Sequence, residues 1–141
     1  MKKLTKIIIL SFLAICISCE DNKANEEPLP EFGSISGVVN FSGSWPDSGE
    51  VLITLDTQYP PMGPPAGFAY IASSDLENSI YNYNFTNLSF RDFSAITVTY
   101  WPEGYATAGS NYALIGSYIE IISVTQDDSD KTIDIDASFS E

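Results

Sequence analysis

The stretch Thr-Ile-Asp-Ile-Asp-Ala-Ser-Phe, residues 132–139, decides the fold class. Polar and apolar residues alternate strictly along it, and the apolar set is Ile133, Ile135, Ala137 and Phe139. Alternation with a period of two residues is typical of a β-strand that has one face in a core and the other in water. The stretch therefore predicts an amphipathic strand.

The same period recurs upstream in six further runs that are rich in β-branched and aromatic residues. They are Ser34–Ser42, Glu50–Asp56, Phe68–Ser73, Ile80–Leu88, Ser94–Trp101 and Tyr112–Thr125, the last of them long enough to be broken. No run shows a helical period with caps, and residues 74–79 have room for one helical turn at most. Seven short strands with turn residues between them are typical of a two-sheet sandwich. We therefore predict an all-β, seven-stranded antiparallel Greek-key β-sandwich over residues 33–141.

The N-terminal residues have the pattern of a secretion signal. Three lysines within the first six residues precede an apolar run over residues 7–15, which is too short to span a bilayer as a final anchor. Ser18 and Cys19 then resemble the lipobox of bacterial lipoproteins, whose cysteine receives a diacylglycerol before cleavage, although Cys16 stands where that motif prefers Leu, Val or Ile. We expect a lipoprotein signal peptide over residues 1–18 and lipidation, palmitate included, at Cys19. The alternatives are an uncleaved anchor and an ordinary signal peptide.

Residues 19–32 are predicted to be the lipidated cysteine and a disordered acidic tether, because they hold almost no apolar side chains. The pair Glu20-Asp21 resembles the export tags of some Gram-negative surface lipoproteins, and we favour surface display on the outer membrane over a merely soluble linker. All 19 acidic residues but only three of the six basic ones follow residue 18, so cleavage would change the net charge from −13 to −16. This charge repels nucleic acid and anionic lipid, so we expect membrane association through the lipid anchor and no nucleic-acid partner.

The segments SISGVVNFSG at 34–43, YNFTNL at 83–88 and IDIDASF at 133–139 resemble strands of the prealbumin-like domains, the transthyretin and carboxypeptidase-regulatory-like group. The resemblance covers about residues 33–139. Members of the family usually continue after the second segment with a Pro-Gly-x-Tyr turn, whereas Ser89–Phe93 stands here without Gly or Pro, so the register of the next strand is open. The resemblance implies an accessory module that supports, spaces or binds rather than one that catalyses.

The chain contains no histidine, and both cysteines lie at or before position 19. Histidine-dependent nucleophilic catalysis and imidazole metal sites are thereby excluded, and the domain has no disulfide. Paired carboxylates can hydrolyse glycosides, but a small sandwich rarely forms the deep cleft that such enzymes need. The acidic run at residues 127–130 lacks EF-hand spacing and is interpreted as a solvated turn, with a weak Ca²⁺ site as the alternative. We therefore expect no enzymatic activity, no cofactor and no dedicated metal site.

Two features offer a ligand or partner surface. The proline-rich connection at residues 59–67 is either a rigid crossing between two strands, which we prefer, or an exposed docking strip. Aromatic residues near strand ends either stack against sugars or fill and cap the core, and they are Trp45, Tyr59, Tyr100, Trp101, Tyr105 and Tyr112. The candidate surface predicted from both features consists of Trp45, Tyr59, Met62, Trp101 and Tyr105.

Two functional hypotheses follow from these features. The first is a non-catalytic, lipid-anchored cell-envelope protein that acts as an interaction or scaffold module for another envelope protein. The second is a carbohydrate-binding surface lipoprotein that presents aromatic rings to a polysaccharide. The sequence favours the first because it requires fewer features, and a change of Trp45 or Trp101 fluorescence on titration with glycans would favour the second.

Overall fold

Ten β-strands and one 3₁₀ turn make up the part of the chain that the structure, a computed structural model, describes: residues 28–106 and 109–139. In order they are β1 (Gly33–Ser42), β2 (Glu50–Asp56), β3 (Gly67–Ile71), the 3₁₀ turn η1 (Ser73–Asp75), β4 (Ile80–Leu88), β5 (Arg91–Phe93), β6 (Ala95–Trp101), β7 (Ala113–Tyr118), β8 (Ile122–Val124), β9 (Asp130–Thr132) and β10 (Ile135–Ser138). The predicted signal peptide, the lipidation site Cys19 and most of the tether lie outside the described residues. Within the described residues, no helix is long and apolar enough to cross a membrane.

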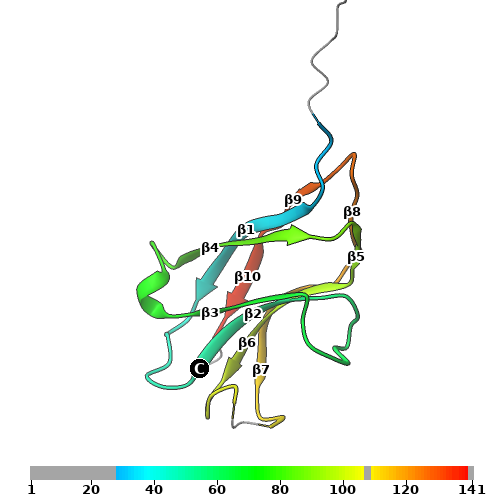
Figure 1. The fold of residues 1–141 in the computed structure, drawn as a ribbon. Helices are drawn as coiled ribbons and strands as arrows, with labels where there is room; N and C mark the ends of the chain where they lie inside the picture. The colour runs from blue at the N-terminus through cyan, green and yellow to red at the C-terminus, as the bar shows by residue number, and fades with distance from the viewer. Residues whose placement is uncertain (1–27, 107–108, 140–141) are drawn as a thin grey trace, which may run out of the picture.

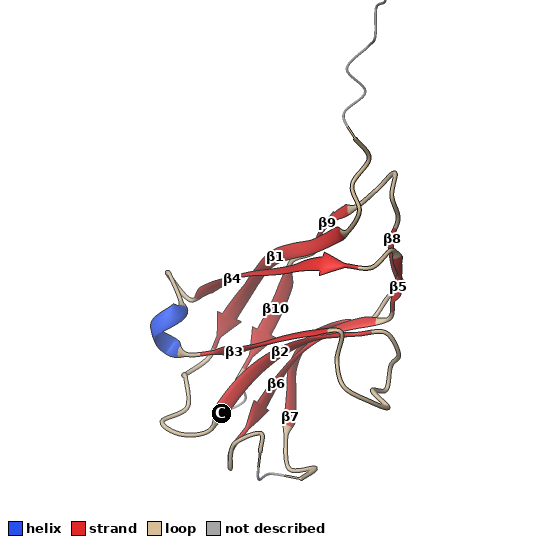
Figure 2. Ribbon diagram, in the orientation of Figure 1, coloured by secondary structure: helices blue, strands red, loops and turns tan. Residues whose placement is uncertain are grey.

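The main sheet has the strand order β3-β2-β6-β7-β10-β1-β4, with β9 paired to β1 as an eighth strand. It curls so that β3, β2, β6 and β7 form one layer and β10, β1 and β4 the other, with the loops gathered mostly at the ends (Figures 1 and 2). Among the described strands, the two layers are continuous through the pairing of β7 with β10, in which Gly116 lies opposite Ala137. A separate ladder joins β5 to β8.

One apolar core lies between the two layers. It receives every second residue of the long strands, among them Ile35 and Val39 from β1 and Ile53 from β2. Phe93, at the end of β5, is among the largest side chains that are fully buried. The apolar residues that alternate in the sequence therefore point into one common core, as expected for a sheet with one covered face.

The prediction of an all-β, sandwich-like domain is confirmed, but the prediction of a purely antiparallel sheet is wrong. Strand β1 pairs parallel with both β9 and β10, while its other neighbour β4 is antiparallel. Alternation reports which face is buried but not in which direction the neighbouring strand runs, so the sequence pattern could not show this. The strand order does not confirm the predicted Greek-key connectivity.

The predicted last strand, Thr132–Phe139, is interrupted at residues 133–134: only Thr132 belongs to β9, and β10 covers Ile135–Ser138. The interruption lies where the chain approaches β1 closely. The backbone N–H of Ile133 donates to the Ser36 carbonyl (2.8 Å), and the Val38 N–H donates to Asp134 Oδ1 (3.0 Å) instead of to a backbone carbonyl. A Cβ atom at Gly37 would overlap the Ile133 carbonyl oxygen, so only glycine allows this approach. Tyr83 donates its hydroxyl to the same oxygen (2.5 Å), and burial together with the Asp134 charge raises the pKa of Tyr83.

The other strand predictions differ mainly at their ends. The predicted bounds Glu50–Asp56 and Ile80–Leu88 are those of β2 and β4. The predicted Tyr112–Thr125 strand is divided into β7 and β8. The segment Ser89–Phe93, which departs from the prealbumin-like pattern, contains the additional strand β5, whose partner is β8 rather than a strand of the main sheet.

Candidate functional site

The outward face of the central strands β2 and β6 is largely buried. On this face Leu52 lies opposite Thr99, and Thr54 lies opposite Thr97, with Asp56 at the end of β2. The exposed fractions are 1% for Leu52, 4% for Asp56 and Thr97, and 8% for Thr99. A face turned away from the core can be this inaccessible only if other parts of the chain cover it. Tyr70 and Phe68 of β3 flank Leu52 and Thr54 on the same face, and loops provide the rest of the cover.

The proline-rich connection between β2 and β3 supplies one part of the cover. It folds back over the outward face, and the Ala66 N–H donates to the Leu55 carbonyl (2.7 Å) where the chain re-enters β3. Four of its residues line the covered space, namely Tyr59, Pro61, Gly63 and Pro65. The connection is therefore a crossing between two neighbouring strands that also forms one wall of a cavity.

The aromatic residues after β6 supply the opposite wall. Trp101 is stacked on Tyr112 with ring centroids 4.6 Å apart and makes an edge contact with Tyr105 at 5.0 Å. The indole N–H of Trp101 donates to Thr99 Oγ1 (2.8 Å), which fixes the ring over β6. The backbone N–H of Tyr105 donates to Glu50 Oε2 (2.7 Å), which ties this loop to the start of β2.

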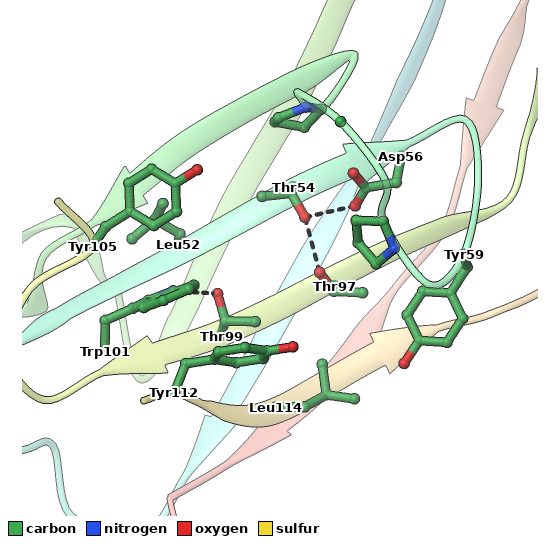
Figure 3. Close-up of a pocket in the computed structure, with 13 residues that line it drawn as sticks. Leu52, Thr54, Asp56, Tyr59, Thr97, Thr99, Trp101, Tyr105, Tyr112 and Leu114 are labelled. Atoms are coloured by element: carbon green, nitrogen blue, oxygen red, sulfur yellow. Dashed lines mark hydrogen bonds between the residues drawn. The ribbon is translucent and has the colours of Figure 1, made fainter. Parts of the chain in front are cut away.

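Between these walls lies a concavity of about 230 Å³, which we call the aromatic groove (Figure 3). Its floor consists of Leu52, Thr54, Asp56, Thr97 and Thr99, and its walls consist of the four residues of the proline-rich connection together with Trp101, Tyr105, Tyr112 and Leu114. Apolar walls around a few converging polar groups are the usual composition of a binding site.

A chain of hydrogen bonds runs along the floor of the groove. Thr54 donates to Asp56 Oδ2 (2.9 Å), so the Thr97 hydroxyl, 2.8 Å away, donates to Thr54 Oγ1. Burial raises the pKa of the Asp56 carboxyl, and the hydrogen bond from Thr54 opposes this in part. Among the described residues, no group donates to Asp56 Oδ1, and Asp56 forms no ion pair.

The structure brings three of the five predicted surface residues together. Tyr59, Trp101 and Tyr105 all line the aromatic groove. Met62 is 82% exposed on the outside of the proline-rich connection and does not line the groove. Trp45 lies at the end of the core, where its ring packs edge-on against Phe41 and Phe139, and it therefore caps the core.

The polar floor of the groove was missed by the sequence analysis. Thr97 and Thr99 belong to the segment Thr-Val-Thr-Tyr-Trp, in which two threonines share the outward face with Trp101. Residues two apart in a strand share a face, so this spacing could have predicted a polar strip beside the Trp101 ring. Asp56 had no sign of its own, because a carboxylate at a strand end is ordinarily solvated.

A larger hollow beside Trp45 is a weaker candidate. It has a volume of about 560 Å³ and lies between Trp45, Tyr100 and Ile115. Its polar residues, such as Asp47 and Asn111, are exposed to solvent and therefore need no ligand to satisfy them. The polar residues on the floor of the aromatic groove are buried or half-buried, which distinguishes this groove from the hollow beside Trp45.

The chemistry of the described residues suits binding. Among those that line the groove, Asp56 is the one carboxylate and there is no base. The described residues include no group of three or more side chains placed to hold a metal ion. The acidic run at residues 127–130, for which a weak Ca²⁺ site was the alternative interpretation, lies in the turn before β9. Two of its carboxylates have protein partners there: Asp128 forms an ion pair with Lys131, and Asp130 accepts a hydrogen bond from Ser34 (2.6 Å).

Comparison with known proteins gives no relative. No family model, curated protein or solved structure matches this chain. The resemblance to prealbumin-like domains therefore stays a prediction from sequence, and function has to be argued from the groove itself.

Proposed function

We propose that this protein is a non-catalytic, lipid-anchored interaction module of the cell envelope that holds its ligand in the aromatic groove. The observation that carries the proposal is the groove itself: a covered outward sheet face with a buried polar floor and aromatic walls. A face that served only as a sheet surface would be solvated, as the outward side of an antiparallel layer usually is.

The exposure of the aromatic side chains supports a binding role. Tyr59, Tyr105 and Tyr112 are 37%, 45% and 50% exposed, although each carries a large apolar ring. Exposed tyrosines gathered around a concavity are characteristic of recognition sites, because the ring offers contact area and the hydroxyl offers a hydrogen bond.

The sequence supports the anchor and the location. The basic and apolar N-terminal residues, followed by Ser18-Cys19, fit a lipoprotein that is cleaved before Cys19 and attached to the outer membrane. The acidic tether over residues 20–32 would hold the prealbumin-like sandwich away from the bilayer, and the pair Glu20-Asp21 favours its outer face. Two or more acyl chains give stable anchoring without help from basic residues.

The test of the anchor is metabolic labelling with palmitate followed by membrane fractionation. Wild type is expected to be labelled and to sediment with outer membranes, whereas Cys19→Ser is expected to lose the label. Labelling of Cys19→Ser at the wild-type level would contradict the assignment of the lipid to this residue.

The test of the groove is cross-linked co-purification from native membranes with the lipidated chain. Envelope material captured by wild type is expected to be lost in the double variant Tyr105→Ala/Tyr112→Ala. The control is Ile119→Ala/Ile121→Ala, which removes two apolar side chains that are 45% and 63% exposed and do not line the groove. Equal capture by all three proteins would overturn the proposed use of the groove.

A further inference from the structure

We infer that the ligand of the aromatic groove is an uncharged saccharide, bound with apolar ring faces against Tyr105 and Tyr112 and with a hydroxyl donated to Asp56. This inference rests on the proposed function and names the chemical class of the ligand. The saccharide assignment rests on the walls and the floor of the groove together, because either one alone would suit a wider range of ligands.

The walls offer flat apolar surfaces that remain accessible. Trp101 is held between Tyr112 and Tyr105 and uses its indole N–H on Thr99, so it supports the two tyrosines rather than offering a donor. The tyrosines keep about half of their surface exposed. A pyranose ring, with C–H groups on its faces and hydroxyls on its rim, matches flat aromatic surfaces beside polar groups.

The floor lacks a hydrogen-bond donor at Asp56. Asp56 is 4% exposed, its Oδ2 accepts a hydrogen bond from the Thr54 hydroxyl, and no described group donates to its Oδ1. No buried side-chain oxygen of the described residues lacks a partner, so Oδ1 remains in contact with solvent. A ligand hydroxyl that displaces this solvent can donate to Oδ1 in its place and form a hydrogen bond to a charged acceptor. A saccharide hydroxyl supplies this donor without adding charge, and the threonine hydroxyls offer further partners.

A peptide ligand fits this floor less well. Strand β2 is paired on both sides, with β3 and β6, and β6 is paired with β2 and β7, so neither exposes a backbone edge. A peptide laid across the groove would leave its own amide groups without the backbone partners that strand addition provides. Hydroxyl groups, which both donate and accept, are easier to satisfy with threonines and a single carboxylate.

Charge and size narrow the class further. Arg91 and Lys131 are the only basic residues in the described part of the chain, and neither lines the groove, so uronic or sulfated sugars would be repelled. A volume of about 230 Å³ is below the range of roughly 300–1,000 Å³ usual for drug-sized ligands. The groove therefore suits a short segment of a saccharide rather than a large folded ligand.

Affinity electrophoresis of the full lipidated protein tests the inference. Native gels would contain neutral polysaccharides (dextran, mannan, arabinoxylan and galactomannan) or anionic ones (alginate and polygalacturonate), and oligolysine would represent a cationic ligand. The detergent must have no sugar headgroup, since a maltoside or glucoside could occupy the groove. We expect at least one neutral polysaccharide to retard wild type, with no retardation by the anionic ones.

Variants locate the binding to the groove. Tyr105→Ala/Tyr112→Ala is expected to weaken binding of the retarding polysaccharide at least tenfold, and Asp56→Asn about fivefold, because a charged hydrogen bond becomes a neutral one. Ile119→Ala/Ile121→Ala, which removes exposed apolar side chains away from the groove, is expected to bind as wild type does. Trp45→Phe leaves Trp101 as the sole tryptophan, whose emission is expected to shift on titration with an oligosaccharide of the same polymer.

The outcomes separate this inference from the proposed function. Absence of retardation by every neutral polysaccharide, retardation by the anionic ones, or groove-dependent binding of oligolysine would overturn the saccharide assignment. If the tyrosine variant still lost its envelope ligand in co-purification, the proposed function would stand without it. If the tyrosine variant also captured its envelope ligand as wild type does, the saccharide assignment and the proposed function would both fail.

Discussion

The two outward faces of this molecule come from the same alternation of residues but differ in solvent exposure. On the layer of β10, β1 and β4 the outward side chains are mostly polar and are exposed or half-buried, and Asn40 donates across the face to Asp136 (3.1 Å). On the layer of β2 and β6 the outward side chains Leu52, Thr97 and Thr99 are buried. The first face is a solvated surface, and the second is the floor of the aromatic groove.

The difference lies in the connections rather than in the strands. The proline-rich connection folds over β2 and β6, and the aromatic residues after β6 close the other side (Figure 3). The connections around β1 and β4 run across the ends of the layers and leave the face open (Figure 2). A binding site was therefore added to a sheet by its loops, as is usual for function carried on a rigid scaffold.

The largest expected effect lies in the layer with the solvated face, at Gly37. The substitution Gly37→Ala would push a methyl group into the Ile133 carbonyl, which is a backbone group held between β9 and β10, so no rotamer change relieves the clash. We expect a loss of about 4 kcal/mol or more in the free energy of unfolding, measured by urea denaturation.

The control for this loss is Gly63→Ala in the proline-rich connection. A Cβ atom there meets nothing within 4 Å, so the free energy of unfolding is expected to stay within about 0.5 kcal/mol of wild type. Similar losses for the two alanine variants would contradict the account of how β9 and β10 approach β1.

A pair of outward-facing apolar residues tests the comparison directly. Leu52→Ala on β2 is expected to destabilise the protein by about 3 kcal/mol, because its side chain is as inaccessible as a core leucine. Val38→Ala on β1 removes a half-buried side chain from the open face and is expected to cost less than about 1 kcal/mol. Equal losses in denaturant unfolding would mean that the two faces are covered alike.

The smallest expected effect is the pH dependence contributed by Asp56. Burial raises the pKa of this carboxyl above its ordinary value of 3.8, so between the ordinary and the raised pKa the folded state binds more protons than the unfolded state. Stability therefore falls as pH rises through this window and stays lower above it. Asp56→Asn is expected to remove this fall and to raise the melting temperature slightly at pH 7.

The measurement is the difference in melting temperature between wild type and Asp56→Asn across the acidic range, because the other carboxylates cancel in that difference. A variant that is less stable than wild type at pH 7 would show that the carboxylate is satisfied in the groove without a ligand. It would then also weaken the case that a ligand hydroxyl completes this site.

Much of the fold could be predicted from period and residue type alone. The bounds of β2 and β4 follow from alternation, and the all-β class follows from the absence of helical patterns. The parallel neighbours of β1 could not be predicted, because strand direction depends on how the chain crosses between layers. Strand β5 was missed because its three residues are too few to show a period.

The two Trp-Pro pairs show where sequence reasoning stops. Trp45-Pro46 and Trp101-Pro102 are the same dipeptide, each near the end of a predicted strand, and the sequence offers core capping and ligand stacking for both. In the structure Trp45 packs on Phe41 and Phe139 at the end of the core, whereas Trp101 stacks on Tyr112 over the groove. Their difference comes from the packing partners that the tertiary structure places beside each ring.

The sequence by itself determined the strand content, the acidic charge and the absence of histidine chemistry, because these depend on residue type and local spacing. Only the tertiary structure decided which outward face is covered, which aromatic rings stay accessible, and that Asp56 lies under the proline-rich connection. The physical reason is that solvent access is a property of assembled layers and loops, so a site made by covering a sheet face does not exist until those parts pack together.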